Sequence, residues 1–366
     1  MMFQVPAHVS MGWISKPNKF VMQVKVNMLD VSDGDAIIVE LEKSGQRMVM
    51  VIDGGMVGHY LTKLKPKLQE VLKRNGKAAP DIVVCTHYDS DHIGGLIPLI
   101  EDYIDGVKEV WVHETPEVLK DLGNGRDLMD QVVEHADELV LDSAAKVGSN
   151  GVTMLQEKAE FLIESIGQLK QLLSLVPERK VRNVFHGDGP KFAHWPEVKV
   201  LGPTREYFEE LFPPNKKSYE LLSEELREHV LFEGFNRFQQ LAGLKSCDKL
   251  KDEQTASITA TNRASIIIAI DCDKGRLLFT GDAGISSFKR IPDWERELRD
   301  LYFLKIPHHG SNNNISKEIS ELMNPVHAYN SGNRHQDDEV LDCFDSKARN
   351  FSVKTTKLNG DLSFEA

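Results

Sequence analysis

Short apolar runs and segments of helical periodicity alternate along the chain, and they gather in two blocks. Runs rich in Val, Ile and Leu are typical of buried strands, whereas apolar residues spaced three and four apart indicate an amphipathic helix. The first block is predicted to contain strands at 24–30, 36–41, 47–52 and 82–84 and helices at 61–75 and 93–103. The second block is predicted to contain strands at 198–201, 262–270, 276–280 and 304–306. This pattern indicates an α/β protein.

The loop after the strand 82–84 holds a dense group of residues that can bind a metal ion. Four of them fall within six positions, namely His87, Asp89, Asp91 and His92. Imidazoles and carboxylates are the usual nitrogen and oxygen donors for Zn²⁺ or Mn²⁺. The alternative is a polar loop in which Asp91 only caps the following helix. Metal-binding residues also occur at the ends of other predicted strands, and they favour the metal site over the polar loop. One segment of this kind could bind two ions.

Other predicted strands also end at residues suited to such a site. Asp53 follows the strand 47–52, and glycines beside it permit a sharp turn. In the second block, Asp282 and the pair His308 and His309 occupy equivalent positions after strands. One of these two histidines is expected to be a ligand, and the other to orient it or to contact substrate.

Several of these stretches resemble motifs of the metallo-β-lactamase superfamily. The opening motifs are matched by LDVSDGDA at 29–36, VIDGG at 51–55 and HYDSDHIGG at 87–95. Most of the superfamily carries a second His where this chain has Asp89, whereas the hydrolase domain of ComEC-type DNA-uptake proteins carries Asp. The chain is therefore most similar to that branch. HHGS at 308–311 and the segment 328–335 resemble later motifs, although the latter is also compatible with a plain polar loop.

The resemblance implies a four-layer αββα sandwich formed by a single domain, residues 20–366. It also implies that two largely helical stretches, 114–191 and 205–260, are insertions, and their helices are expected to lie outside the sandwich. Isolated histidines in the first insertion or directly before it are expected to be structural, and these are His113, His135 and His186.

The resemblance further assigns roles to individual residues. The implied metal ligands are His87, Asp89, Asp91, His92, Asp282 and His309 or His308. Asp282 is expected to bridge two ions, and Asp91 and His309 to act in catalysis, with Asp91 holding the attacking water. Asp35 and Asp53 are expected to support the ligands, and substrate contacts are expected from Ser311, Asn333, Arg334 and His335. The family's third-motif His is missing after 198–201, so the first ion is expected to be the more weakly bound.

Such a ligand set predicts a hydrolase that uses a hydroxide bound by two divalent ions, zinc or manganese. The resemblance favours a phosphodiesterase or nuclease. Two alternatives stay open: a regulatory or scaffold protein with a vestigial metal site, and a small-molecule hydrolase acting on a thioester or lactone. The metal chemistry is common to many substrates and does not choose among them.

Charge and composition limit the partners. With 44 basic and 56 acidic residues the formal net charge is −12, which repels polyanions. A nucleic acid or nucleotide partner would therefore depend on donors at the site and on the ions. The helical insertions could bind a protein partner.

The lengths of the apolar runs and the spacing of the cysteines indicate the cellular location of the protein. No apolar run reaches the roughly 20 residues that cross a bilayer, and the first 20 residues lack the pattern of a secretory signal. A cytoplasmic protein with no membrane partner is predicted. The 4 cysteines are scattered without a CxxC pair, so reduced thiols are expected.

Overall fold

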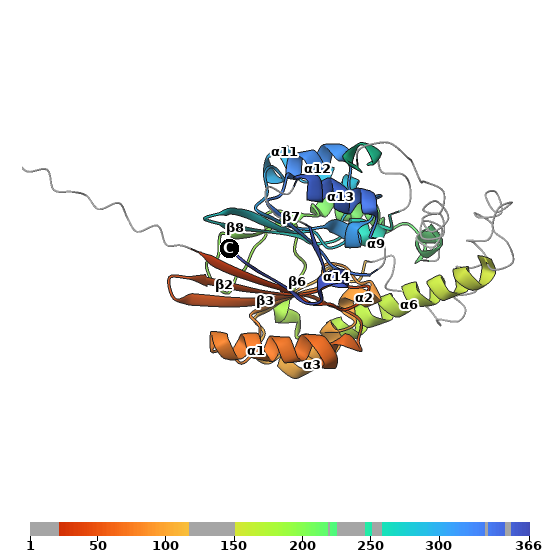
Figure 1. Ribbon diagram of the computed structural model, residues 1–366. Helices are drawn as coiled ribbons and strands as arrows, with labels where there is room; N and C mark the ends of the chain where they lie inside the picture. Colours follow the sequence, from red (N-terminus) through yellow and green to blue (C-terminus); the bar gives the residue numbers. More distant parts are fainter. Residues whose placement is uncertain are drawn as a thin grey trace, which may run out of the picture.

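Two β-sheets stack face to face, and helices cover the outer face of each (Figure 1). This architecture comes from a computed structural model that describes residues 22–116, 151–218, 220–224, 246–250, 258–333, 336–347 and 353–366. The predicted αββα sandwich of an α/β protein is confirmed.

The first sheet is built mainly from the first half of the chain. In spatial order its strands are β13 (Leu362–Glu365), β1 (Gln23–Met28), β2 (Ala36–Lys43), β3 (Gln46–Gly54), β4 (Ile82–Val84), β5 (Glu109–Trp111) and β6 (Val181–Arg182). The predicted strands at 24–30 and 36–41 are present as β1 and β2, and they pair antiparallel. From β3 to β6 the strands are parallel, so their carboxyl ends lie at one edge of the sheet.

The second sheet is built from the second half. In spatial order its strands are β12 (Lys354–Thr355), β11 (His327–Asn330), β10 (Phe303–Lys305), β9 (Gly275–Phe279), β8 (Ile267–Cys272) and β7 (Val198–Gly202). Strands β9 to β12 are parallel. The strand predicted at 262–270 begins later than expected, because Thr259 caps a short helix, α9 (Ala260–Arg263), by accepting a hydrogen bond from the Asn262 amide.

The helices form the two outer layers. Those over the first sheet are α1 (Lys65–Asn75), α2 (Ser90–Ile93), α3 (Leu96–Tyr103) and α6 (Gly151–Leu175). Helix α7 (Arg205–Leu211) adds Tyr207 and Leu211 to the same core, and the Tyr207 hydroxyl also contacts Ser286 of the second block. Those over the second sheet or at its edge are α9, α10 (Ile285–Lys289), α11 (Trp294–Glu297), α12 (Lys317–Met323), α13 (Asp338–Lys347) and α14 (Thr356–Asn359). Among the described residues, no helix is long and apolar enough to cross a membrane.

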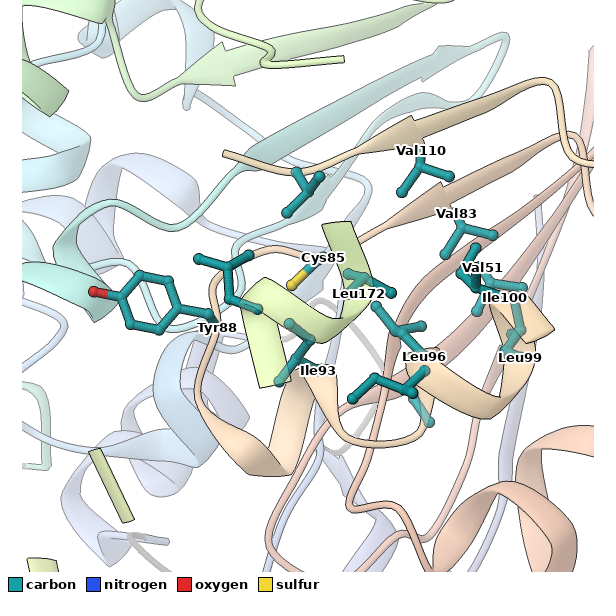
Figure 2. Close-up of a cluster of buried hydrophobic side chains, with 14 of the residues drawn as sticks. Val51, Val83, Cys85, Tyr88, Ile93, Leu96, Leu99, Ile100, Val110 and Leu172 are labelled. Atoms are coloured by element: carbon teal, nitrogen blue, oxygen red, sulfur yellow. The ribbon is translucent and has the colours of Figure 1, made fainter. Parts of the chain in front are cut away.

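Apolar side chains fill the space between the sheets and the space under each helical layer. Under the first layer, valines of β3, β4 and β5 face the apolar side of α3, as Figure 2 shows. Leu172 of α6 completes this cluster. The loop that leaves β4 is therefore anchored on both sides by close-packed core.

The stretch 114–191, predicted as an insertion, contributes to the sandwich itself. Within it, β6 pairs with β5 and extends the first sheet. Helix α6 buries Leu162, Ile166 and Leu169 in the core beneath the sheet, and continues beyond the sandwich (Figure 1). Residues 117–150, with His135, lie outside the described part of the chain, as does 225–245 of the second predicted insertion.

Cys247 and Cys343 form a disulfide, which corrects the expectation that every cysteine is reduced. The bond joins a turn at Ser246–Lys249 to α13 across a sequence separation of 96. Cys85 and Cys272 are free. Scattered cysteines gave no sign of the pairing, because only the packing of these two elements brings the sulfurs together.

Candidate metal centre

The ends of strands from both sheets meet at one place. Because β3 and β4 are parallel neighbours, Asp53 and the loop after Val84 emerge at the same edge. In the second sheet β9 and β10 are also parallel, and Asp282 and the histidine pair 308–309 follow them. The Ile266 amide donates to the Thr86 carbonyl at 2.9 Å, which joins the two sheets beside the site.

Asp282 lies at the centre of the predicted ligand set. Its Oδ2 is close to the Nε2 atoms of four histidines, at 3.8 Å from His87, 3.5 Å from His92, 3.6 Å from His308 and 3.6 Å from His309. The other two predicted ligands flank this group. Asp89 Oδ2 is 3.7 Å from His87 Nε2, and Asp91 Oδ2 is 4.0 Å from His309 Nε2. The fold thus brings together the six residues and the second histidine that the sequence singled out.

Asp53 orients His92 from behind. Its carboxylate accepts the amide and the hydroxyl of Thr86 at 2.7 and 2.6 Å. The same carboxylate lies 3.0 Å from His92 Nδ1, so that the Nε2 atom points toward Asp282. A carboxylate on the far nitrogen of an imidazole fixes its ring orientation and raises its basicity as a ligand. This contact matches the supporting role predicted for Asp53.

Asp35 is held by a lysine that the sequence analysis missed. Lys305 Nζ is 2.5 Å from Asp35 Oδ2, donates to the Gly281 carbonyl at 3.1 Å, and lies 3.7 Å from Asp282 Oδ1. The lysine is fully buried, which opposes its charge, but Asp35 and Asp282 outweigh burial and raise its pKa. Lys305 therefore stays cationic. In the sequence, the sign of this buried cation was a lysine placed between Leu304 and Ile306 in an otherwise apolar strand.

The site is built on unusual backbone. His308, His309 and Asp53 have φ values of 44°, 52° and 58°. Residues other than glycine rarely adopt this left-handed backbone conformation. Such conformations cost free energy and are found where surrounding structure enforces them, often at functional sites. Gly332 shows how tightly His309 is enclosed, because a Cβ on this glycine would lie 2.6 Å from the ring.

Electrostatics at the site favour binding of a cation. Burial opposes a charge on His92, yet the carboxylates of Asp282, Asp91 and Asp53 raise its pKa well above the usual value. Burial raises the pKa of Asp91 to about 7. The neighbouring carboxylates raise the pKa of both groups, whereas burial raises the pKa of Asp91 and opposes the charge on His92.

The side chains present fit divalent ions. Among the described residues, the buried Nε2 atoms of His87, His92 and His309 have no hydrogen-bond partner, although they point at carboxylates. Buried polar atoms are normally paired, so three unpaired ligand atoms at one point indicate a bound group. Donors bonded to one zinc ion at about 2.0–2.2 Å would lie roughly 3.4 Å apart, close to the spacings around Asp282. The donor atoms Asp91, His92 and His309 lie within 4.8 Å of one another, as do those of His87, His92 and Asp282.

The residues proposed for substrate contact are only partly described. Ser311 is fully buried, and its hydroxyl accepts a hydrogen bond from the Asn313 amide at 3.4 Å. Asn333 follows β11 in the chain, and its backbone carbonyl accepts a hydrogen bond from Lys357 Nζ at 3.2 Å. Arg334 and His335 lie outside the described residues. His113 and His186, expected to be structural, contact the backbone carbonyls of Val184 and Leu201.

Comparison with known proteins agrees with this architecture. Residues 29–191 match the model of the Metallo-beta-lactamase superfamily. The matched stretch includes the loop 87–92 and β2 to β6, but neither Asp282 nor the histidine pair. No curated protein matches the sequence.

Among solved structures, one described as "AidC, a Dizinc Quorum-Quenching Lactonase, in complex with a product N-hexnoyl-L-homoserine" aligns with this chain at 10% identity and a TM-score of 0.30. The alignment covers 68% of this chain and 56% of that one, so the chain spans little more than half of that protein. Similarity this low gives no basis for transferring its substrate.

Proposed function

We propose that this protein is a metal-dependent hydrolase that holds two divalent ions, zinc or manganese, and cleaves phosphodiester bonds in a nucleic acid or nucleotide. The observation that carries the proposal is the meeting of four imidazoles on one carboxylate oxygen, Asp282 Oδ2. The residues that would hold the ions are His87, Asp89, Asp91, His92, Asp282 and His309 or His308.

The formal charge of the site supports two ions. Among the described residues of the site, one ammonium, that of Lys305, accompanies five carboxylates, which belong to Asp35, Asp53, Asp89, Asp91 and Asp282. With neutral histidines, their sum is minus four, which two divalent cations neutralise. An unneutralised charge of this size is costly in a buried site.

The protein groups have distinct tasks in this proposal. Bound divalent ions supply a water nucleophile at neutral pH and stabilise the charge of a phosphoryl group. Asp91, whose side chain is 20% exposed, is placed to accept a proton from an incoming water. Asp53 and Lys305 hold His92, Asp35 and Asp282 in place, so that these groups need not reorganise during the reaction.

The choice of phosphodiester rests on the resemblance of Asp89 and its neighbours to the ComEC-type branch. The net charge of −12 opposes binding of a long polyanion. Neutralisation of the site by ions would offset this repulsion locally. A lactone or thioester uses the same ions, so substrate assays decide between these classes.

The proposal is tested by assaying one preparation with labelled DNA, RNA, a cyclic dinucleotide, a lactone and a thioester, each with Zn²⁺ and with Mn²⁺. Cleavage of a phosphodiester is expected. Asp91→Asn should lower that rate by about 10²–10⁴-fold, since an amide cannot accept the proton. The matched control is His194→Ala, because His194 is an exposed histidine, and this variant should match the wild type.

Hydrolysis of the lactone or thioester alone would contradict the phosphodiester assignment and keep the hydrolase. No hydrolysis of any substrate by a protein that has bound metal would favour a regulatory or scaffold role.

A further inference from the structure

We infer that His308 and His309 bind different ions, so that each ion receives two imidazoles, one aspartate of its own and a share of Asp282. This inference rests on the proposed two-ion site and assigns its ligands. One ion would take His87, His308 and Asp89, and the other would take His92, His309 and Asp91.

The ligands of the second ion form one compact group. The donor atoms of Asp91, His92 and His309 all lie within 4.8 Å of one another. His309 Nδ1 faces away from this group, 3.7 Å from Asp35 Oδ1, and so leaves Nε2 directed at Asp91 and Asp282. His309 Nε2 and Asp91 therefore lie on the same side of Asp282.

His308 lies on the other side, together with His87. His308 Nε2 is 3.5 Å from Asn262 Nδ2, and His87 Nδ1 is 3.4 Å from Ser265 Oγ. These two contacts come from one short segment, in which the Ser265 amide donates to the Asn262 carbonyl at 3.0 Å. The segment 262–265 thus borders both imidazoles.

Asn314 fixes the protonation of His308. Its side-chain Nδ2 donates to the carbonyls of Asp282 and Ala283 at 2.8 and 3.2 Å, so its Oδ1 is left as an acceptor. That Oδ1 is 2.8 Å from His308 Nδ1, which must therefore carry the proton. In the neutral ring Nε2 is then the nitrogen that carries the lone pair, and it lies 3.6 Å from Asp282 Oδ2. The ring is prepared to bind a metal ion through Nε2.

The backbone separates the two rings. Successive residues in the left-handed conformation, at φ 44° and 52°, place the rings 5.9 Å apart and inclined by 64°. Both rings nevertheless reach the same carboxylate oxygen. Two rings that approach one bridging atom from different directions suit two ions rather than one.

The consequence is that both ions have a similar set of two nitrogen and two oxygen donors, which suits tetrahedral zinc. The expectation that the first ion is short of nitrogen ligands would then not apply. His308 is the outermost of the four imidazoles, with 13% of its side chain exposed against 3% for His309, and it belongs to neither compact group of donor atoms.

The test is the number of bound ions and their affinity, measured by titration calorimetry and elemental analysis with Zn²⁺ and by the absorption of bound Co²⁺. His308→Gly and His309→Gly are informative variants, because glycine favours the positive φ at both positions and should not impair folding. The wild type and the control His194→Ala should bind two ions. Each glycine variant should keep one ion at wild-type affinity and lose the other by more than about 100-fold.

Three further measurements distinguish a His308 that binds an ion from one that only lies near it. Asn314→Ala should weaken only the ion lost in His308→Gly, by roughly the 10- to 100-fold typical of a group that orients a ligand. Added imidazole should restore to His308→Gly the ion that it has lost, the one bound by His87 and Asp89, since imidazole can occupy the vacated space. The Co²⁺ absorption bands lost in His308→Gly and in His309→Gly should differ.

Two tightly bound ions in His308→Gly would overturn the inference, as would loss of the same ion in both variants. Wild-type protein that binds two ions as described but cleaves no phosphodiester would contradict the proposed substrate and leave the ligand assignment intact. Wild-type protein that binds no ion would overturn both.

Discussion

At the scale of single residues, Asp282 has the largest predicted effect, because its Oδ2 contacts all four imidazoles. Asp282→Asn removes a negative ligand shared by two cations, so we expect loss of both ions and of hydrolysis together. The fold should survive, since removing one charge from a carboxylate cluster relieves repulsion. Elemental analysis and thermal melting measure the two effects. A variant that binds two ions like the wild type would contradict the bridging role.

His113 provides a prediction about pH. Burial between aromatic rings lowers its pKa to about 4, and its Nε2 donates to the Val184 carbonyl. The unfolded chain takes up a proton near pH 6.5, whereas the folded protein does not. The free energy of unfolding should therefore fall as the pH drops below about 6.5, by about 2 kcal/mol at pH 5.

His113→Gln retains a donor for Val184 but cannot titrate. Denaturant unfolding at pH 7.5 and pH 5 should show a smaller decrease for this variant than for the wild type, by about 2 kcal/mol. Equal decreases would mean that His113 does not contribute to the pH dependence.

At the scale of elements, α6 is predicted to stabilise the whole sandwich. Leu169 is fully buried under the first sheet, and truncation to Ala should lower the free energy of unfolding by about 2–5 kcal/mol. Glu160→Ala, at an exposed position of the same helix, should change it by less than about 0.5 kcal/mol. A Leu169→Ala protein as stable as the wild type would show that α6 is a detachable insertion.

The disulfide ties α13 to the turn at 246–249, and it closes a loop with a sequence separation of 96. Cys247→Ser, made at the less buried of the two sulfurs, should lower the free energy of unfolding by about 2–4 kcal/mol without reductant. With reductant present, wild type and variant should be equally stable. The free thiol of Cys272 gives the control, because Cys272→Ser should retain the full response to reductant.

At the scale of the whole molecule, bound ions should stabilise the fold, because a site assembled from both sheets does not exist in the unfolded chain. Each ion should add about 4 kcal/mol when its free concentration is a thousand times its Kd. Thermal melting should therefore shift upward with Zn²⁺ and downward with a chelator. Asp282→Asn should show little shift in either direction. A wild-type melting temperature that is indifferent to both additions would contradict the site.

Much of this architecture could be predicted from local patterns. The apolar run Ile82–Val84 followed by His87 to His92 identified both a buried strand and the loop at its end, because strand periodicity and ligand chemistry are properties of neighbouring residues. The same is true of Asp282 after β9. The error at 262–266 had a local cause, since the Thr259 cap competes with extension of the strand.

Contacts between distant segments were decided by the tertiary structure. The sequence determined which residues could bind ions, but it could not show that Lys305 faces Asp35, or which side of Asp282 each histidine of the pair 308–309 approaches. It also gave no pairing for Cys247 and no sign that α6 belongs to the core. These features depend on the packing of two sheets against each other. That packing is the sum of many weak contacts over the whole chain, and no single stretch of sequence specifies it.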